Sequence, residues 1–467
     1  MVRRLISGAA GQALTVGLVS FVLALIGIGG SDIGGDEAVS WWSSQLEWTS
    51  LARVLGHQDM NFGPYYAFQH VWTLVSTDVW WMRLPSATGA AVAAAGTAGL
   101  ARYLFNAKAG WLAGLLLVVS LSWVAFAQEI RPYSWALALA TLATWAFVRL
   151  CDRPAGRLTA VYLLLMLLLP LAHLFAGMVA GVHLLYALSR REFRLAGLAA
   201  LGVLPSLAVA VIVSAQVKQV AQLGVPTPLA AVREWVGLNS AWWYVPVALL
   251  AAASLLLHRR LSVGTGRSRA DVILFASWWI LPPLLLWVAT ALITPVYAAR
   301  YLLWTLPAIV IPAAGLLSGL MVRATGRVAV AVVVSGLIVA MIPAQVQVRS
   351  GSGHFWEPQS LANTIKSMRG PSDALVAPDY GVRFPVMYYL QDVGLPEPLV
   401  TVPAEEVGTF DPKVVAVQNE PAQLASFSRV WLLSRPGEIH RLPSGFCAQE
   451  SWTSRFNVAA LTLANRC

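Results

Sequence analysis

The stretch Gly34-Gly35-Asp36-Glu37-Ala38-Val39-Ser40-Trp41-Trp42 places two adjacent carboxylates directly after the first long apolar run of the chain. The glycines permit a sharp turn, after which Asp36 and Glu37 stand where a helix would begin. The positive end of the helix dipole favours their ionised forms, and an ionised carboxylate can act as a general base. We therefore take Asp36, with Glu37 beside it, as the candidate base. The alternative is that Asp36 only caps a helix at a membrane surface.

The composition around this stretch is that of a membrane protein with many spans. Of the 467 residues, 58% are hydrophobic and only 12% are charged. No ordinary soluble domain approaches this balance. The first apolar run, 13–29, is expected to be an uncleaved anchor rather than a cleaved signal peptide. Ten further runs follow, at 84–101, 109–127, 133–149, 158–172, 173–189, 195–216, 241–257, 272–293, 300–318 and 328–345. The predicted fold class is a polytopic α-helical membrane protein with about 11 transmembrane helices.

The charges predict how these helices are oriented. Up to residue 348 the chain has 22 Lys and Arg against 11 Asp and Glu, whereas from Arg349 onward it has 10 against 11. With a cytoplasmic N-terminus, sixteen of the 22 cations fall in inner loops and six in outer loops, as the positive-inside rule requires. Asp36 then faces the extracytoplasmic side of the cell membrane. No basic, aromatic-interleaved soluble stretch is present, so nucleic-acid binding is not expected.

Residues 30–83 form the first predicted outer loop. Apolar residues at helical spacing predict two helices that lie flat on the membrane. Aromatic side chains stand along them, among them Trp41, Trp42, Tyr65, Tyr66 and Trp72. These rings either form a belt at the level of the lipid headgroups or shape a groove where a sugar stacks and a polyprenyl chain enters.

The composition changes after Ala344, and we predict a transmembrane domain over 1–345 and an extracytoplasmic α/β domain over 346–467. Strands are predicted at 374–377, 398–402, 413–417, 429–434 and 457–464, with helices near 358–369 and 381–391. Cys447 and Cys467 both lie in this outer domain. An oxidising compartment favours a disulfide between them, the alternative being two free thiols.

The sequence lacks the motifs that usually accompany metal, nucleotide or serine-nucleophile chemistry. The sequence contains no strong metal-ligand cluster, phosphate loop, dinucleotide fingerprint or serine-nucleophile elbow, so no cofactor is predicted with certainty. The middles of the apolar runs hold no Asp, Glu, Lys or Arg, where an ion-coupled transporter would usually place one. His173 and His183 are the ionisable exceptions, and each also suits a packing role.

Charged residues gather instead at the predicted outer ends of the spans. Glu129 and Arg131 lie between the third and fourth runs, and Arg300 opens the tenth. Arginine can hold a phosphate with two hydrogen bonds, and a carboxylate can take a proton from an attacking hydroxyl. This combination suits transfer of a group from a lipid phosphate. Alternatively, each arginine binds no ligand and only extends its charged group to the membrane–water interface.

The sequence resembles the GT-C superfamily of polyprenyl-phosphate-dependent glycosyltransferases, in particular the protein O-mannosyltransferase and aminoarabinose transferase type. The resemblance covers roughly residues 10 to 320. It rests on the acidic pair and on four further segments: Met82-Arg83-Leu84-Pro85-Ser86, Ala127-Gln128-Glu129-Ile130-Arg131-Pro132-Tyr133-Ser134, His173 and Arg300-Tyr301.

The resemblance implies a role for each of these segments. Asp36, with Glu37, would be the catalytic base, and Arg131 and Arg300 would bind the donor phosphate. Glu129 occupies a place where some relatives have a further carboxylate; whether it would bind a divalent metal, the sugar or neither is left open. The remaining candidates for substrate contact are Tyr65, Tyr66, Tyr133, His173 and Tyr301.

The predicted function is that of a membrane glycosyltransferase. It would transfer a sugar, with inversion, from polyprenyl phosphate to a hydroxyl of a glycan, glycolipid or protein at the outer membrane face. Mannose is the first candidate, with arabinofuranose and aminoarabinose as the others. Two alternatives remain: a flippase or exporter of lipid-linked glycans, and a non-catalytic membrane protein that binds a cell-envelope polymer.

Overall fold

The computed structural model describes the chain except for residues 1–7, 217–223, 262–267, 354–356, 437–441 and 456. Arg3, Arg4, Lys218 and Arg267 of the loop-charge count therefore lie outside the described residues. The chain forms two compact units. We call residues 1–26 with 83–346 the helical unit, and residues 27–82 with 347–467 the mixed unit.

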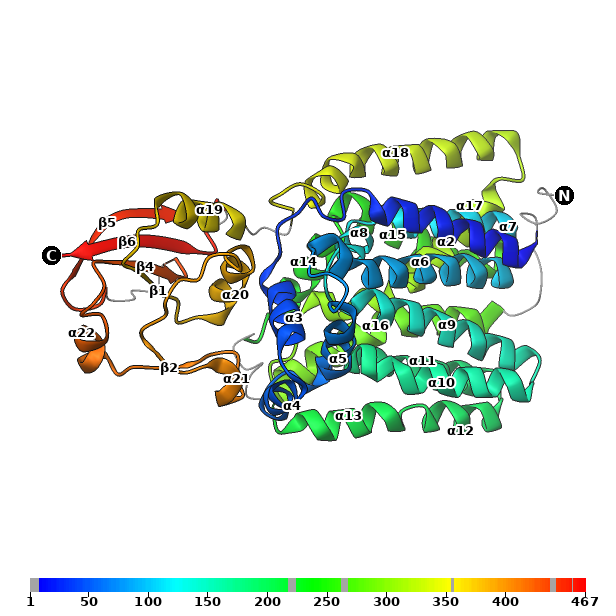
Figure 1. Ribbon diagram of the computed structural model, residues 1–467. Helices are drawn as coiled ribbons and strands as arrows, with labels where there is room; N and C mark the ends of the chain where they lie inside the picture. The colour runs from blue at the N-terminus through cyan, green and yellow to red at the C-terminus, as the bar shows by residue number, and fades with distance from the viewer. Residues whose placement is uncertain (1–7, 217–223, 262–267, 354–356, 437–441, 456) are drawn as a thin grey trace. The chain divides into compact units, whose positions relative to one another are not determined.

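The helical unit consists of helices that overlap all eleven predicted apolar runs (Figure 1). They are α2 (Ala9–Leu25), α6 (Val79–Leu104), α7 (Ala107–Val119), α8 (Leu121–Ala127), α9 (Tyr133–Asp152), α10 (Gly156–Ala172), η2 (Leu174–Met178), α11 (Val179–Ser189), α12 (Phe193–Leu201), α13 (Leu204–Ser214), α14 (Pro228–Leu238), α15 (Ala241–Leu261), α16 (Ser268–Leu292), η4 (Ala299–Thr305), α17 (Pro307–Leu320) and α18 (Ala324–Val348). Among the described residues, four helices are long and apolar enough to cross a membrane, or up to seven if three bent pairs each count as one span. The number of eleven spans stays a prediction.

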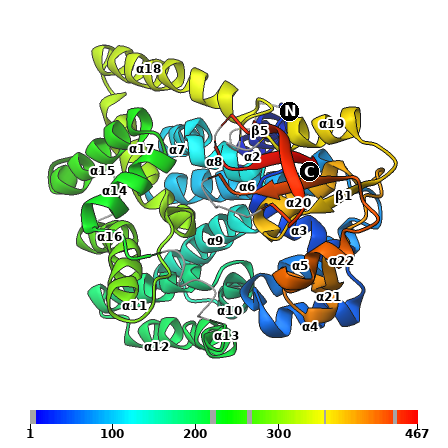
Figure 2. The same ribbon diagram turned by 90° about the vertical axis from the view of Figure 1, so that its left-hand side faces the viewer.

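Small residues let the helices of this unit approach closely. A side chain at Gly89 of α6 would lie 3.0 Å from the backbone nitrogen of Trp135 in α9. Alanine and glycine give α6 little apolar surface, but they allow the two backbones to come near contact. Helix α9 also contacts α10 and α11, while α12 and α13 cover α11 and α10 (Figure 2).

The mixed unit joins the first predicted outer loop to the C-terminal segment. Its helices are α3 (Gly35–Gln45), α4 (Trp48–His57), η1 (Met60–Phe62), α5 (Gly63–Trp72), α19 (Pro358–Met368), α20 (Tyr380–Tyr389), α21 (Ala404–Val407), η5 (Val417–Asn419) and α22 (Glu420–Gln423). Its strands are β1 (Asp373–Val376), β2 (Val400–Val402), β3 (Lys413–Val414), β4 (Arg429–Ser434), β5 (Phe446–Thr453) and β6 (Ala460–Arg466).

Four strands form a mixed sheet in the order β1-β4-β6-β5, and β2 pairs with β3 separately. Strand β4 runs parallel to β1 and antiparallel to β6. Side chains alternate between the two faces of a strand. Trp431 and Leu433 of β4 accordingly pack in a core with α19 and α20, whereas Val430 lies in a second core on the other face, with Leu424.

One strand of this sheet was not predicted. Strand β5 carries mostly exposed side chains, so it has no apolar pattern to reveal it. It pairs antiparallel with β6, with a shift in register between Ala448 and Glu450. Cys447 of β5 and Cys467, directly after β6, are joined by a disulfide with a Cα–Cα distance of 5.3 Å.

The packing of α3 explains why residues 27–82 group with the C-terminal segment. The ring of Trp42 stacks on Phe384 of α20 at 4.6 Å, and Trp41 meets Tyr388 edge-on at 5.2 Å. Further along the loop, the backbone N–H of Phe410 donates to Gln58 Oε1 at 2.6 Å. Residues 27–82 thus belong to the same compact unit as the C-terminal segment, while the predicted division into a transmembrane domain over 1–345 and an extracytoplasmic domain over 346–467 stays a prediction. Trp41 and Trp42, two of the aromatic rings of the first predicted outer loop, thus contact protein side chains.

Candidate functional site

The acidic pair lies at the start of α3, as the turn and helix signals predicted, but its two carboxylates have different surroundings. Glu37 is 1% exposed, and its Oε2 accepts a hydrogen bond from the backbone N–H of Gly34 at 2.9 Å. This contact is half of a capping box, which satisfies a backbone donor at the helix start. Asp36 is half-buried. Of the two carboxylates, Asp36 is thus the one that reaches solvent.

Several acids of the mixed unit act on Tyr380, the first residue of α20, and α20 packs against α3. Burial raises the pKa of the Tyr380 hydroxyl, and the carboxylates of Asp59, Asp411, Asp36 and Asp379 raise it further. Geometry places Asp411 there as well, because its Oδ1 accepts a hydrogen bond from the Tyr380 backbone N–H at 3.2 Å. Acids of the N-terminal loop and of the C-terminal segment thus both act on the Tyr380 hydroxyl.

Tyr65 and Tyr66 of α5 are both buried, at 6% and 0% exposure. The hydroxyl of Tyr66 donates to Asp59 Oδ2 at 2.8 Å, and the hydroxyl of Tyr65 accepts from Gln69 Nε2 at 2.8 Å. Each tyrosine therefore has an internal polar partner that fixes its ring. Their contact with substrate stays a prediction.

Trp72, the last of the rings considered for a sugar-binding groove, packs within the mixed unit. It stacks on Trp81 with centroids 4.5 Å apart, and each indole N–H donates to the other residue's carbonyl, at 2.8 and 3.0 Å. Ring stacking and two hydrogen bonds together hold these two residues in one fixed arrangement. Trp72 thus links α5 to the start of α6.

In the helical unit, three predicted residues from distant segments come together. Tyr133 begins α9, His173 links α10 to η2, and Tyr301 lies in η4. The His173 ring is 5.6 Å from Tyr133 and 4.9 Å from Tyr301, and the two tyrosine rings are 6.4 Å apart. Tyr133 is 2% and His173 is 4% exposed. The cluster therefore builds a packed aromatic wall.

Arg300 lies against this wall. Its guanidinium carbon is 5.4 Å from the centre of the Tyr301 ring, within the range of a cation–π contact. Segment η4, which carries both residues, is held by α14: the backbone N–H of Ala299 donates to Glu234 Oε1 at 2.9 Å. The hydroxyl of Tyr297 also donates to the Ala231 carbonyl at 2.9 Å. These bonds fix the backbone next to Arg300.

Arg131 and Glu129 lie in the turn between α8 and α9. Arg131 is 3% exposed, and its carbonyl accepts a hydrogen bond from Ser86 Oγ at 2.9 Å. Its own N–H donates to the Glu129 carbonyl at 2.8 Å. The neighbouring Gln128 donates through Nε2 to the carbonyls of Ala24 and Ile26, at 2.7 and 2.8 Å. The turn is thus bonded to α2 and α6, while Glu129 is half-buried.

Three buried or hydrogen-bonded polar residues were not among the predicted site residues. Glu234 holds η4, Gln128 holds the end of α2, and Arg83 is a fully buried cation at 0% exposure. Arg83 and Gln128 carry a sequence signal, because each lies in a segment on which the resemblance rests, at the predicted outer end of a span. Glu234 carries none, because its role depends on how α14 packs against η4.

Glu129 was considered as a metal ligand. Among the described residues, no group of three or more His, Cys, Asp or Glu side chains is placed to hold a metal ion. The residues around Glu129 therefore do not form a ligand set, and we derive no step that involves a metal.

Solved structures with the same arrangement of helices are known. ArnT from Cupriavidus metallidurans in the apo state covers 97% of this chain and 98% of its own, with a TM-score of 0.60 and 13% identity. This chain has the ArnT fold. ArnT bound to undecaprenyl phosphate is similar over 98% of both chains, with a TM-score of 0.59 and 13% identity.

A second solved protein shares the fold of this chain and of ArnT. The apo oligosaccharyltransferase of Archaeoglobus fulgidus has a TM-score of 0.52 and 12% identity, over 91% of this chain and 69% of that one. No family model and no curated protein match the sequence. The predicted fold class, a helical membrane protein with a C-terminal α/β domain, is confirmed at the level of the fold, while the number of spans stays a prediction.

Proposed function

We propose that this protein is a membrane glycosyltransferase that takes a sugar from a polyprenyl-phosphate donor. The observation that carries the proposal is the fold shared with ArnT over nearly the whole length of both chains, one ArnT structure being bound to undecaprenyl phosphate. The predicted acid, arginines and aromatic residues fit the same chemistry. We further propose that transfer takes place at the outer face, with the N-terminus in the cytoplasm.

Asp36 is the proposed general base. Attack of an acceptor hydroxyl on the anomeric carbon passes through an oxocarbenium-like state and inverts that carbon, while the C–O bond to the phosphate breaks. The hydroxyl proton goes to the Asp36 carboxylate, and the electron pair of the broken bond stays on the phosphate. Glu37 supports this step by closing the first turn of α3, since its carboxylate bonds to the Gly34 N–H.

Arg300 and Arg131 are the proposed ligands of the departing phosphate. A guanidinium can donate two parallel hydrogen bonds to phosphate oxygens, and it neutralises the charge that collects there. The Tyr301 ring and the bond from Ala299 to Glu234 support Arg300. Tyr133, His173 and Tyr301 are proposed to face the donor, whereas Tyr65, Tyr66 and Glu129 are proposed substrate contacts outside this cluster.

Mannose remains the first proposed sugar, with arabinofuranose and aminoarabinose as the other candidates. A glycan, a glycolipid or a protein hydroxyl is the proposed acceptor. Hydroxyl recognition depends on individual hydrogen bonds, so one donor should react far better than its relatives.

The test uses full-length purified protein with synthetic polyprenyl-phosphate donors that carry each of the three sugars. A membrane extract supplies the acceptor, and the free polyprenyl phosphate and the glycosylated product are measured together. We expect one donor to release polyprenyl phosphate as its sugar appears in the product. Movement of intact donor between leaflets, with no release from any donor, would instead identify a flippase.

A further inference from the structure

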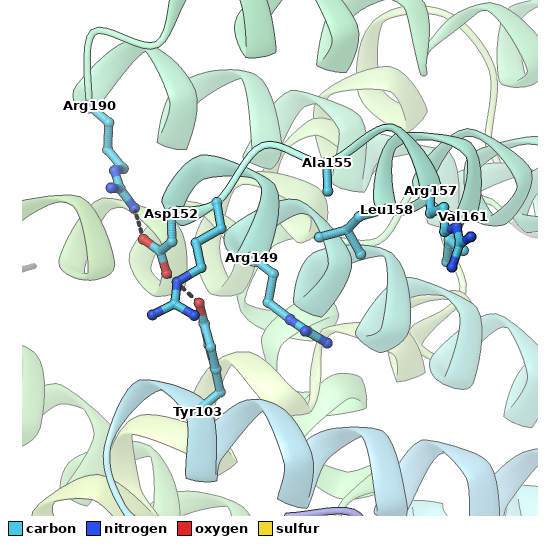
Figure 3. A pocket seen from close by; sticks show the side chains of 9 residues that line it. Tyr103, Arg149, Asp152, Ala155, Arg157, Leu158, Val161 and Arg190 are labelled. Carbon is cyan, nitrogen blue, oxygen red and sulfur yellow. Dashed lines mark hydrogen bonds and ion pairs between the residues drawn. The ribbon is translucent and has the colours of Figure 1, made fainter.

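A polar cavity lies in the helical unit, where α9 ends and α10 begins (Figure 3). Its volume is about 810 Å³. Tyr103 of α6 and Arg190 at the end of α11 complete its wall. It is lined by Tyr103, Arg149, Asp152, Arg153, Ala155, Arg157, Leu158, Val161 and Arg190.

The cavity is far from the proposed donor-phosphate ligand Arg131. Arg131 and Tyr133 lie at the N-terminal end of α9, whereas Arg149 and Asp152 lie in its last turn. A helix of 20 residues is about 30 Å long, close to the thickness of the hydrocarbon core of a bilayer. The cavity and Arg131 therefore lie at opposite ends of one helix, and the cavity needs a separate explanation.

The charge of the cavity is strongly positive. Four arginines line it against one acid, and that acid is already engaged: Asp152 Oδ1 lies 2.8 Å from an Arg190 guanidinium nitrogen. Asp152 Oδ2 accepts a hydrogen bond from the Tyr103 hydroxyl at 2.6 Å (Figure 3). Arg190 thus offsets Asp152, and three arginine charges remain in excess.

The three remaining arginines are exposed and available to a ligand. Within the part of the chain that the structure describes, no carboxylate pairs with Arg149, Arg153 or Arg157. Three guanidiniums around one cavity repel one another, and their planar donors bind carboxylate and phosphate oxygens. The expected ligand is therefore an oxyanion, and phosphate is the oxyanion that membrane phospholipids supply.

One side of the cavity is apolar, which narrows the class of ligand. Leu158 and Val161 of α10 line it, and Val161 is 48% exposed. The same helix carries further exposed leucines one and two turns on, with Leu164 at 54% and Leu168 at 39%. Residues three and four apart share a helix face, so an apolar stripe leads away from the arginines. A ligand with a phosphate and a hydrocarbon chain matches both surfaces.

We propose that this cavity binds the headgroup of an anionic membrane phospholipid. Its phosphate is held by Arg149, Arg153 and Arg157, and its acyl chains lie along the exposed face of α10. Basic pockets between membrane helices bind anionic headgroups by this combination of charge and apolar contact. Loop charges place the cavity on the predicted cytoplasmic side, where anionic lipids are abundant. The lipid is distinct from the donor, and the proposal does not depend on the proposed function.

The test measures binding to full-length protein in an uncharged detergent. Labelled phosphatidylglycerol is titrated against wild type, against Arg153→Gln/Arg157→Gln, and against Arg323→Gln/Arg327→Gln. The last pair removes the same charge near α18 from another predicted inner loop, outside the cavity. We expect the cavity pair to weaken binding about 10- to 30-fold, since each cation near anionic lipid contributes roughly a factor of five. The control pair should change it less than about twofold.

Two competitors separate lipid from soluble phosphate. Inorganic phosphate and glycerophosphoglycerol, which carries the headgroup without chains, should displace labelled lipid only weakly. Equal weakening by both arginine pairs would overturn the proposal in favour of general surface charge. Displacement by glycerophosphoglycerol as effective as by the lipid would overturn the role of the acyl chains. The Arg190–Asp152 pair is left intact, and an unchanged unfolding temperature without lipid shows that the variants are folded.

Discussion

The starts of α3 and α9 carry similar residues and use them differently. At α3, charged Asp36 precedes Trp41 and Trp42, whose rings pack on α20 within the mixed unit. At α9, Tyr133 follows Arg131, and its ring meets His173 and Tyr301 from two distant segments. Aromatic residues next to a charge thus fix a helix in one place and build a side-chain wall in the other. Sequence spacing does not distinguish these two uses.

The largest expected effect separates the two carboxylates of α3. For Asp36→Asn we expect transfer to fall about 10²- to 10⁴-fold, because the base is lost while the amide keeps the shape of the side chain. Turnover is measured as release of polyprenyl phosphate, with the unfolding temperature as the check on folding. Wild-type turnover would exclude Asp36 as the base.

Glu37→Ala is the matched neighbouring variant. Its main expected effect is a loss of about 0.5–2 kcal/mol in the free energy of unfolding, because the Gly34 N–H loses its partner. Loss of turnover in Glu37→Ala at unchanged stability would contradict this structural role.

The second expected effect concerns the helical unit. Arg300→Ala should lower turnover by about 10²- to 10³-fold and weaken donor binding, because one charge-stabilising donor is removed. Donor affinity is measured by titration with a non-reactive polyprenyl phosphate. Arg233→Ala, on the exposed face of α14, is the control and should leave both values unchanged. Unchanged donor affinity in Arg300→Ala would remove Arg300 from the site.

A smaller effect tests the aromatic packing that fixes α3. A double-mutant cycle of Trp42→Ala and Phe384→Ala should give a coupling of about 0.5–1.5 kcal/mol, the usual value for a stacked pair. The measurement is the free energy of unfolding of the four proteins in the cycle. A coupling near zero would mean that the stacked rings contribute nothing beyond their separate burial.

The smallest effect is a pH dependence in the C-terminal segment. Burial tends to raise the pKa of Asp373, but hydrogen bonds from Arg429, Gly370 and Trp431 outweigh it, and the pKa is lowered. The stabilisation is therefore present above the unfolded pKa, about 3.9, and is lost as the pH falls through the lower folded value. Unfolding temperature is measured against pH for wild type and Asp373→Asn. The two should differ at pH 7, and the difference should shrink as the pH falls below about 3.9.

The exposed pair of Asp392 and Lys366 provides the control for this measurement. Asp392→Asn should change the unfolding temperature little at any pH, because exposed pairs contribute little. A pH dependence as large in Asp392→Asn as in Asp373→Asn would show that the buried bonds to Arg429 and Trp431 are not its source.

Much of the fold could be predicted from the sequence. Long apolar runs have few alternatives to helices in a membrane, because every backbone polar group must be bonded internally. Strands such as β1 and β4 follow from short apolar runs between turn residues. Strand β5 could not be predicted, because its exposed side chains give no pattern and only pairing with β6 defines it.

In the candidate site too, the residue types could be predicted from the sequence, whereas their contacts could not. The order of residue types around Asp36, Arg131 and Arg300 indicates a chemistry, because acids, guanidiniums and aromatic rings have fixed capabilities. The hydrogen-bond partners of these segments cannot be predicted from sequence spacing. Ala299 and Glu234 are 65 residues apart, and no residue pattern near either one predicts the hydrogen bond between them.

The sequence by itself determined the apolar helices, the cysteine pair and the position of the acidic pair at a helix start, because these depend on local composition and short spacing. Only the tertiary structure decided that residues 27–82 pack with the C-terminal segment, and that Glu37 rather than Asp36 is buried. Such choices depend on contacts between residues far apart in the chain. These contacts stabilise the protein only after folding has brought the distant residues together.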